Sequence, residues 1–463
     1  MKTTKKVMML NINHYDEIEN RLEQYAKEGL ILKKTGTIFW TFTKSEPQNL
    51  KYTVTYFKEG SVFNPEYTDN QLTYFEYAKA SGWELVCEFG QMQIFCNSQE
   101  NPVPFETDDM EKLENIHKCM KKSFIPSQVL LLVVWILNLG VRIPSLISRP
   151  IDFLSDKVNL VSMLMFTSVV IFSAYTIISY YNWYNNSKKS ILMGGEIKKS
   201  YSKTKSFFEK IYLVGLFAVL VYQFAIVFND VNAWVIVLMA LQVPFYIFVF
   251  SGMIKLLKKL KVSAITNRII TFVVYIFVAI SFTAFVFYIV VNFDLTKPDE
   301  QRYNIIEWNL PNGDVYDYRI YSDEIPLTCE DLYGETDFEY YSYLKQVDKT
   351  IFLTKEKYSQ QAPPVKEDIP EINYEIYTSK YNWVQKVVLN ELITDKEKFD
   401  YHAEIMDNNI FGTNEAYTFY DTNDAKKSYI SEYILVYEDK IIKINPTKQF
   451  NENESDMVIE KLR

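Results

Sequence analysis

The residues best suited to catalysis are few in this sequence and lie far apart. The three histidines are His14, His117 and His402, which lie in different regions of the chain. A catalytic triad or a metal centre needs several such groups at one place. The sequence also contains no P-loop, HExxH, GxSxG or GxGxxG motif. We therefore expect no enzyme activity, no cofactor and no bound metal.

Two pairs of residues could bind a metal ion or take part in redox chemistry. His117 and Cys119 form an HxC pair, which is half of a zinc site, but structural zinc needs four ligands. We interpret the pair as ordinary surface residues. Cys87 and Cys96 lie on the two arms of an expected hairpin, and in a reducing cytoplasm we expect buried thiols there. With no CxxC pair in the chain, a disulfide framework is not supported.

An acidic group and an aromatic group are candidate binding sites. Asp323, Glu324, Glu330 and Asp331 have oxygen ligands for Ca²⁺, but no DxDxDG-type loop orders them, which favours a solvated acidic face. The aromatic group has the spacing of strand residues, which more often form the face that helices cover. If uncovered, it is a possible partner-binding face. Its members are Trp40, Phe42, Trp83, Phe89 and Phe95.

A long apolar region separates the two ends of the chain. Each of its segments has close to the ~20 residues that a helix needs to cross the hydrocarbon of a bilayer. We therefore predict five membrane-spanning helices within residues 124–293. Arg142 closely follows the first segment and is expected to extend toward an interface. The predicted spans are residues 124–141, 158–181, 211–229, 232–254 and 269–293.

The positive charges between these segments predict an orientation. Residues 182–210 hold seven lysines and residues 255–268 hold five basic residues, so both connectors are expected inside the cell. Residues 1–123 then lie in the cytoplasm of a bacterial cell and residues 294–463 outside. Expected contacts with anionic lipid at the inner face are Lys188, Lys189, Lys198, Lys199, Lys258, Lys259 and Lys261.

Charge is divided unevenly along the chain. Residues 124–293 carry a net charge of +10, whereas residues 294–463 hold 19 basic and 35 acidic residues, a net charge of -16. Neither terminal region has a basic patch of its own, so we expect no nucleic-acid partner.

A composition of 48% hydrophobic and 23% charged residues excludes a disordered chain.

Residues 1–105 show the pattern of an α+β domain with an internal repeat. A short strand, an amphipathic helix at 16–29 and a hairpin (LILKKTGTIFWTFTKS) are followed by a strand, a helix at 69–82 and a second hairpin turning near Gly90. The text YAKEG at Tyr25 returns as YAKASG at Tyr77. A repeated β-α-β unit predicts a ferredoxin-like sandwich, with two helices on one antiparallel sheet. Residues 106–123 are expected to form a juxtamembrane helix.

These segments carry a family resemblance. The helix ending in YAKEGLILKKTG, the strand FWTF, the segment YFEYAKASGWELV and the hydrophobic region that follows resemble the domain of unknown function 2812 family. The resemblance covers roughly the first 120 residues and the general layout of the rest. It implies a multi-pass membrane protein of Gram-positive bacteria. Its motifs are packing motifs and imply no catalytic residue.

The last 170 residues are long enough for a core of their own, and we predict a second α+β domain. Helices are expected at 380–393 and 452–462, and Glu438 with Asp439 is expected to form a hairpin turn. Residues 359–371 have the composition of a loop. The predicted strands are residues 315–320, 350–354, 374–377, 417–420, 429–437 and 440–445.

Two folded domains on opposite faces of a membrane have the layout of a receptor. We therefore expect a sensor or regulatory protein, whose outer domain meets a ligand, an envelope component or a partner and whose cytoplasmic domain meets a protein partner. The alternative is an accessory or scaffold subunit of a transporter or cell-envelope complex, in which the spans contact a larger membrane protein.

Overall fold

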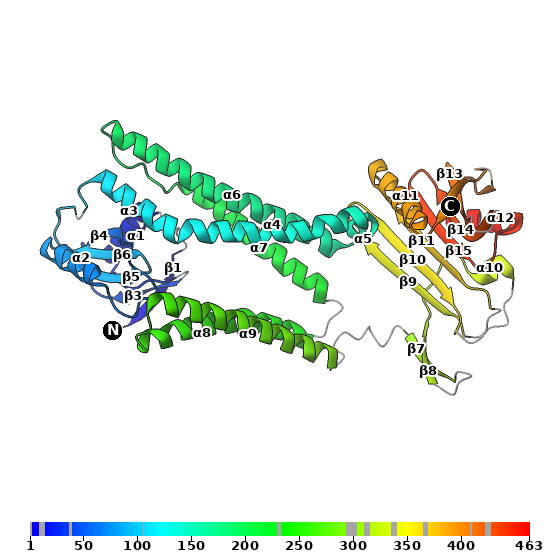
Figure 1. Ribbon diagram of the computed structural model, residues 1–463, viewed down its shortest axis with the longest axis horizontal. Coiled ribbons are helices and arrows are strands. Elements are labelled where there is room, and N and C mark those ends of the chain that lie inside the picture. Colours follow the sequence, from blue (N-terminus) through cyan, green and yellow to red (C-terminus); the bar gives the residue numbers. More distant parts are fainter. Residues whose placement is uncertain are drawn as a thin grey trace. The chain divides into compact units, whose positions relative to one another are not determined.

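The structure is a computed structural model that describes residues 2–8, 14–36, 39–104, 106–228, 233–292, 303–309, 315–334, 340–363, 369–407, 410–421 and 427–463. The chain divides into two compact units. The first comprises residues 1–137 and 166–296, and the second comprises residues 138–165 and 297–463. Each unit therefore combines one terminal domain with part of the apolar middle region (Figure 1).

The N-terminal domain contains two copies of one β-α-β-β unit. The first copy runs β1 (Thr3–Val7), α1 (Tyr15–Lys27), β2 (Leu30–Lys34), β3 (Phe39–Lys44), and its sheet has the order β1-β3-β2. The second runs β4 (Lys51–Tyr56), α2 (Asp69–Ala80), β5 (Glu84–Phe89), β6 (Met92–Asn97), with the order β4-β6-β5. The strand order is the same in both, so the sequence repeat is also a repeat of structure.

The prediction of a ferredoxin-like sandwich is wrong. That fold places both helices on one antiparallel sheet, whereas this domain has two separate sheets of three strands. The reason lies in the last strand of each copy, which pairs on both of its edges. Strand β3 pairs with β1 and β2, and β6 pairs with β4 and β5. Each copy therefore completes its own sheet.

Residues at equivalent positions in the two copies have the same backbone conformation or the same burial. Gly29 and Gly82 follow the two helices with φ of +78° and +83°, a left-handed conformation that glycine adopts without steric cost. Phe42 and Phe95 lie on the central strands and are both 0% exposed. The helix ends and the central strands are therefore the parts that the repeat has kept.

A single core joins the first copy to the sheet of the second and to α3 (Asp109–Lys122). Helix α1 contributes Ile18, Leu22 and Ala26, which recur every four residues and so lie on one face. Asp108 caps α3, since its Oδ1 accepts hydrogen bonds from the N–H groups of Met110 and Glu111. Other core members are Phe42, Val54, Ile94, Ile116 and Met120.

Long helices make up the apolar middle of the chain. Three continuous helical stretches are long and apolar enough to cross a membrane: Asp109–Ser148, Lys157–Leu192 and Ala264–Ile289. The helices of this region are α4 (Phe124–Ser148), α5 (Pro150–Ser155), α6 (Lys157–Leu192), α7 (Lys203–Phe228), α8 (Ala233–Lys259) and α9 (Ala264–Asn292).

The prediction of five membrane-spanning helices is therefore wrong. Three of the predicted spans lie in α4, α6 and α9, but the spans predicted at 211–229 and 232–254 correspond to α7 and α8, which do not qualify over the described residues. Residues 229–232, where these two predicted spans meet, lie outside those residues. Apolar length read from the sequence is therefore not enough to establish a span. Helix α8 packs along α9, where the Tyr246 hydroxyl donates to the Ala279 carbonyl at 3.3 Å.

The C-terminal domain is built on one antiparallel sheet of seven strands in the order β12-β13-β14-β15-β11-β10-β9. A separate pair, β7 (Tyr303–Asn309) and β8 (Val315–Tyr321), precedes it. The helices are α10 (Cys329–Tyr333), α11 (Asn382–Glu397) and α12 (Glu452–Leu462). The seven strands are β9 (Ser342–Lys349), β10 (Thr354–Gln361), β11 (Ile372–Thr378), β12 (Tyr401–Ile405), β13 (Glu415–Asp421), β14 (Ser428–Val436) and β15 (Lys440–Pro446).

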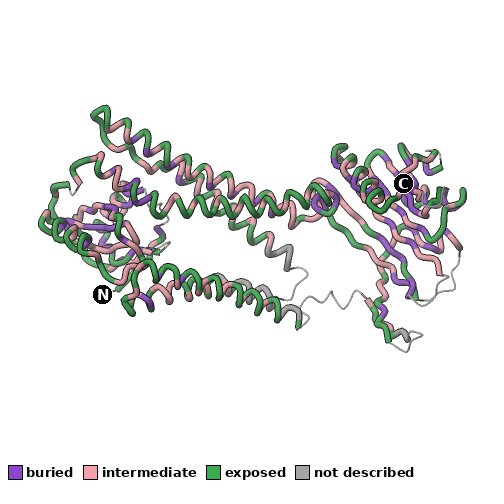
Figure 2. Tube along the Cα trace, viewed as in Figure 1, coloured by how far each residue is buried: buried purple, intermediate pink, exposed green. Residues whose placement is uncertain are grey.

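Apolar residues line both faces of this sheet. On one face Tyr374, Ile442 and Val458 belong to a core that includes residues of α10 and α12. On the other face Tyr377 and Val388 belong to a core that includes residues of α11 and α5. Figure 2 shows the buried residues running along the strands of this domain. The domain is thus a sheet with helices on both faces.

The sequence patterns located most C-terminal elements, but one strand was misplaced, the end of β10 was predicted as loop, and β7, β9, β12 and α10 were not predicted. The helix predicted at 452–462 coincides with α12, and that at 380–393 overlaps α11. The strand predicted at 350–354 is wrong, because Thr350 and Leu353 form the turn between β9 and β10. Strands β9 and β10 are rich in polar residues, so part of β10 reads as loop in the sequence.

We predict that Gly29→Ala destabilises the N-terminal domain by about 2–3 kcal/mol, because the residue is left-handed and an added Cβ would lie 2.5 Å from the Ser45 carbonyl oxygen. Gly194→Ala is the matched control. Gly194 has a similar φ of +81° but nothing within 4 Å of an added Cβ, so about 1 kcal/mol is expected. Thermal unfolding of the detergent-solubilised protein measures both, and equal losses would contradict the steric argument.

Candidate functional site

The short helix α5 is a connector that packs into a folded domain. It joins α4 to α6 and belongs to the same compact unit as the seven-stranded sheet. Pro150 occupies its first turn, where the missing N–H costs no hydrogen bond. Beside it, Arg142 of α4 donates to the Asn159 side-chain oxygen of α6 at 3.1 Å. The two long helices are therefore tied together close to α5.

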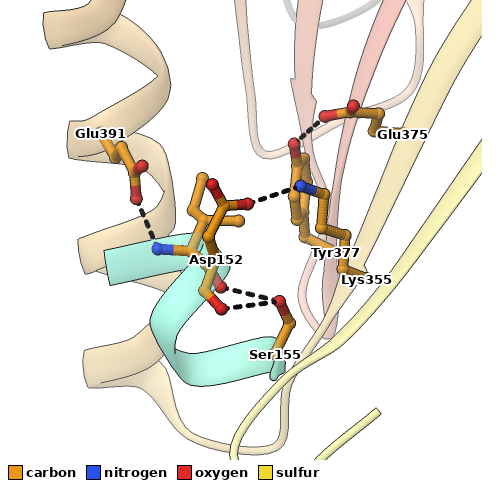
Figure 3. Close-up of polar contacts among 7 residues, drawn as sticks. Asp152, Ser155, Lys355, Glu375, Tyr377 and Glu391 are labelled. Atoms are coloured by element: carbon orange, nitrogen blue, oxygen red, sulfur yellow. Dashed lines mark hydrogen bonds and ion pairs between the residues drawn. The ribbon is translucent and has the colours of Figure 1, made fainter. Parts of the chain in front are cut away.

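Three hydrogen bonds fix α5 to the C-terminal domain, and we call this contact the α5 interface. Glu391 of α11 accepts from the backbone N–H of Ile151 at 2.6 Å, and Lys355 of β10 pairs with Asp152 at 2.9 Å. At the other end of α5, the Thr350 hydroxyl donates to the Leu154 carbonyl at 2.5 Å. Figure 3 shows Glu391 and Lys355 approaching α5 from a helix and a strand. Both ends of α5 are thus held.

Apolar packing supplies the rest of the α5 interface. Ile151, Phe153 and Leu154 are 4%, 2% and 6% exposed. Ile151 and Leu154 belong to the core that contains Val388 of α11 and Tyr377 of β11. Complete burial of an aliphatic or aromatic side chain contributes about 1.5–3 kcal/mol. The connector is therefore an integral part of this domain.

Glu391 is the buried acid of the α5 interface. Glu391 is only 9% exposed, and this burial raises the pKa of its carboxyl group to about 7. The hydrogen bond from the Ile151 N–H lowers the same pKa. The charges of Asp395 and Asp152 raise this pKa further, and Lys355 lowers it. The carboxyl group therefore changes protonation close to neutral pH.

Tyr377 connects the α5 interface to the open sheet. The residue is 2% exposed, and its hydroxyl donates a hydrogen bond to the Glu375 carboxylate on the same strand (Figure 3). Burial, followed by the nearby charge of Glu375, raises the pKa of Tyr377 well above its ordinary value. The hydroxyl therefore stays protonated and continues to donate this bond.

The N-terminal domain contacts two connectors within its own unit. Residues 193–202, between α6 and α7, reach α1. Ser200 donates to the Asp16 carboxylate at 3.4 Å, and Arg21 donates to the Tyr201 hydroxyl at 3.4 Å. These contacts place the connector against the domain.

The second connector, between α8 and α9, meets the loop that precedes α2. The Asn267 side chain donates to the Phe63 carbonyl at 3.1 Å, and Lys261 pairs with Glu66 at 2.7 Å. Both lysine-rich connectors therefore contact the N-terminal domain, whereas the connector that contains α5 belongs to the C-terminal unit.

The lysines predicted as lipid contacts have mixed surroundings. Lys188 pairs with Glu114 at 3.5 Å, and Lys261 pairs with Glu66. Lys258 is half-buried and lines a small cavity with Glu88. These three contact protein groups as well as any headgroup. The remaining four are exposed: Lys189, Lys198, Lys199 and Lys259.

The aromatic residues predicted as a possible partner face lie inside the N-terminal domain. Trp40 and Phe42 are 4% and 0% exposed and belong to the main core. Trp83 and Phe95 are 4% and 0% exposed and form a smaller core beneath α2, and Phe89 is half-buried at the edge of the main core. Helices cover these side chains, so they do not present a surface to a partner.

The histidines are separate in the structure. His14 is 3% exposed and meets the edge of the Tyr201 ring, and burial, followed by the charge of Lys205, lowers its pKa to about 4. His117 lies between tyrosines, with its Nδ1 3.0 Å from the Tyr180 hydroxyl. His402 lies on β12 of the other unit.

The remaining candidate groups are also held by protein contacts. Cys87 faces Ile94 and Cys96 faces Glu84 across their hairpin, so the two thiols are not opposite each other. Asp331 pairs with Lys461 at 2.9 Å, and Glu330 accepts hydrogen bonds from Gln360. Over the described residues, no three histidine, cysteine or acidic side chains gather in a way that would hold a metal ion.

The α5 interface was not predicted from the sequence. Residues 142–157 lie between the first two predicted spans, and only Arg142 among them was singled out. A signal was present, because the segment PIDFLS places Ile151, Phe153 and Leu154 in a connector that would otherwise be polar. The partners of α5 come from residues 350–391, so no local pattern indicates them.

Comparison with known proteins gives one match. Residues 14–127 match a family described as "Protein of unknown function (DUF2812)". The match extends from α1 to the start of α4 and so covers most of the repeat and α3. Neither the curated proteins nor the solved structures contain a significant match.

We predict that the C-terminal domain loses stability as the pH rises from about 5 to 8. Burial raises the folded pKa of Glu391 from 4.5 to about 7, so its contribution is complete below pH 4.5 and is lost as the pH rises through 7. After allowance for solvent screening, the expected loss is about 1–2 kcal/mol. Thermal unfolding at a series of pH values measures it.

Glu391→Gln is the control for this prediction. The amide oxygen can still accept from the Ile151 N–H, but it does not titrate. The difference between the two proteins isolates Glu391 from other titrating groups. Parallel stability profiles for the wild type and the variant would show that Glu391 does not titrate in this range.

Proposed function

We propose that this protein, whose residues 14–127 belong to the DUF2812 family, is a membrane sensor or regulatory protein in which the C-terminal domain controls the long helices through the α5 interface. The observation that carries the proposal is the burial of the α4–α6 connector inside that domain. A change in the sheet that altered this contact would act directly on the ends of two helices.

Membrane association is supported by the three long apolar helices. The proposed orientation places residues 1–123 in the cytoplasm and the C-terminal domain outside. Three crossings by α4, α6 and α9 put the chain termini on opposite sides. They also put α5 on the side of the C-terminal domain and the two lysine-rich connectors on the side of the N-terminal domain.

The contacts within each unit agree with this arrangement. Ile151 contacts the C-terminal domain, whereas Ser200 and Asn267 contact the N-terminal domain. The lysine-rich connectors are also the ones that the positive-inside rule assigns to the cytoplasm. Two independent lines of reasoning, charge and contact, therefore give the same sides.

Regulation by this route requires two states of the α5 interface with different helix positions. A ligand or partner shifts such an equilibrium only by its difference in affinity for the two states. The buried carboxyl of Glu391 and the ion pair of Asp152 with Lys355 are contacts that can be exchanged for water. Exchange of these polar contacts can therefore shift α5 while Ile151 and Leu154 stay packed in the core.

Hydrogen–deuterium exchange tests the proposal. We predict that Glu391→Ala raises exchange in residues 149–156 about tenfold, because a charge-assisted hydrogen bond to the Ile151 N–H is lost. Transmission also predicts a change in the connectors at 193–202 and 260–268. Glu397→Ala, on the exposed side of α11, should change neither region.

The distribution of the change separates the candidate functions. An effect confined to residues 149–156 would contradict transmission and would leave a scaffold subunit of a larger membrane complex as the better explanation. No effect in residues 149–156 would show that Glu391 does not hold α5.

Orientation is tested by cysteine labelling in intact bacterial cells. In a cysteine-free background, we predict that Glu452→Cys on α12 reacts with a membrane-impermeant maleimide, whereas Lys79→Cys on α2 reacts only after permeabilisation. Both positions are exposed within their domains, so folding does not protect either one. The reverse pattern, or equal labelling in intact cells, would contradict the proposed sides.

A further inference from the structure

A polar groove lies on the same face of the seven-stranded sheet as the α5 interface. Its volume is about 500 Å³, within the range of small-molecule sites. Strands β9, β10, β11 and β15 form its floor. The side chains that point into it from this face are Leu344, Gln346, Lys357, Ser359, Gln361, Asn373, Glu375, Lys443 and Asn445.

The groove begins where the cover of α11 ends. The row of the sheet through Tyr377 and Ile441 is packed beneath α11 and α5. The next row on this face brings Lys443, Glu375 and Lys357 side by side on three adjacent strands. Neighbouring strands are about 4.8 Å apart, so the two lysines are about 10 Å apart with Glu375 between them.

The charge of the groove is opposite to that of its domain. Residues 294–463 carry a net charge of -16, yet the groove lining holds two lysines and a single acid. That acid, Glu375, already accepts a hydrogen bond from Tyr377. Lys443 lies 3.6 Å from the buried Glu432 carboxylate, whereas Lys357 is exposed and makes no ion pair with the described residues. A cationic site in an acidic domain favours an anion and disfavours cations.

Uncharged hydrogen-bonding groups surround these lysines. Asn373 and Asn445 face each other across β11 and β15, and Ser359 continues the row on β10. The Oδ1 atom of Asn445 is buried and has no hydrogen-bond partner among the described residues. A buried polar atom without a partner is uncommon. Asn445 therefore keeps an acceptor that a water molecule or a donor from a ligand can satisfy.

We propose that this groove binds a small organic carboxylate that also carries hydroxyl or amide groups, with its carboxylate held by Lys357 and Lys443 and its neutral groups by Asn373 and Asn445. The inference deepens the proposed function and rests on it for its biological role. The groove volume suits a single sugar acid or an N-acylated acidic amino acid.

The groove is connected to the α5 interface through its own floor. Glu375 lines the groove and accepts from Tyr377, whose ring packs in the core that also contains Ile151. Lys355, which pairs with Asp152, lies two residues before Lys357 on the same face of β10. A carboxylate bound at Lys357 therefore lies next to both strands that hold α5.

Calorimetric titration of the full-length protein in detergent tests the site. The probes are D-glucuronate with D-glucose as its neutral counterpart, and N-acetyl-L-glutamate with N-acetyl-L-alanine amide as its counterpart. We expect one carboxylate to bind at least tenfold more tightly than its counterpart. The carboxylate that binds distinguishes a sugar source from a peptide source.

Variants locate the binding in the groove. The double variant Lys357→Gln, Lys443→Gln should weaken binding at least tenfold. The control Lys349→Gln, Lys380→Gln, an equal loss of charge at exposed positions outside the groove, should leave it unchanged. Circular dichroism confirms that the double variant is folded. The proposal is overturned if neither carboxylate binds, if the neutral counterparts bind equally well, or if the double variant binds like the wild type.

The two proposals fail in different ways. Absence of binding with the Glu391→Ala exchange effect intact removes the groove and leaves the coupling. Binding that does not alter exchange in residues 149–156 supports the groove as a site and counts against its role in coupling.

Discussion

The second unit depends on one requirement: the backbone groups at the ends of the buried helix α5 must find hydrogen-bond partners. Helix α5 has free N–H and carbonyl groups at its ends, and burying them without partners would cost several kcal/mol. Glu391 accepts a hydrogen bond from the Ile151 N–H at one end, and Thr350 donates one to the Leu154 carbonyl at the other, so the domain supplies a partner at each end. Because α5 continues into α4 and α6 after one residue on each side, the domain is mechanically joined to both helices.

In the first unit, too, the terminal domain contacts the connectors between long helices, but those contacts are less buried. Its domain contacts two connectors through exposed or half-buried polar groups, such as Lys261 with Glu66 and Ser200 with Asp16. Exposed ion pairs and hydrogen bonds contribute little free energy each. The N-terminal domain contacts its connectors mainly through polar groups, and Ile197 packs at the edge of its core, whereas the C-terminal domain buries its connector in a core.

Much of the local structure could be predicted from the sequence, because local patterns determine it. The amphipathic spacing of Ile18 and Leu22, the glycines at 29 and 82, and the amphipathic pattern of residues 452–462 all indicated helices that the structure contains. What failed was the assignment of partners. The repeat predicted a duplicated fold, but not that each copy closes a sheet of its own, since strand order depends on which edges meet.

The candidate sites were largely outside the reach of sequence reasoning. Lys357, Glu375 and Lys443 are 18 and 68 residues apart in the chain, and only the register of three strands makes them neighbours. Each alone reads as an exposed polar residue of a strand. The aromatic residues, by contrast, were conspicuous in the sequence for the ordinary reason that they fill a core.

Because α6 is long, a small change in its angle at α5 corresponds to a large displacement at its other end. A helix of 36 residues is about 54 Å long, and it begins two residues after α5 ends. If α5 acts as the fulcrum, a tilt of about 5° displaces the far end of such a helix by about 5 Å, roughly one helical turn. Under that condition, a small shift at α5 would be magnified by geometry alone, without any change in the internal structure of the helix.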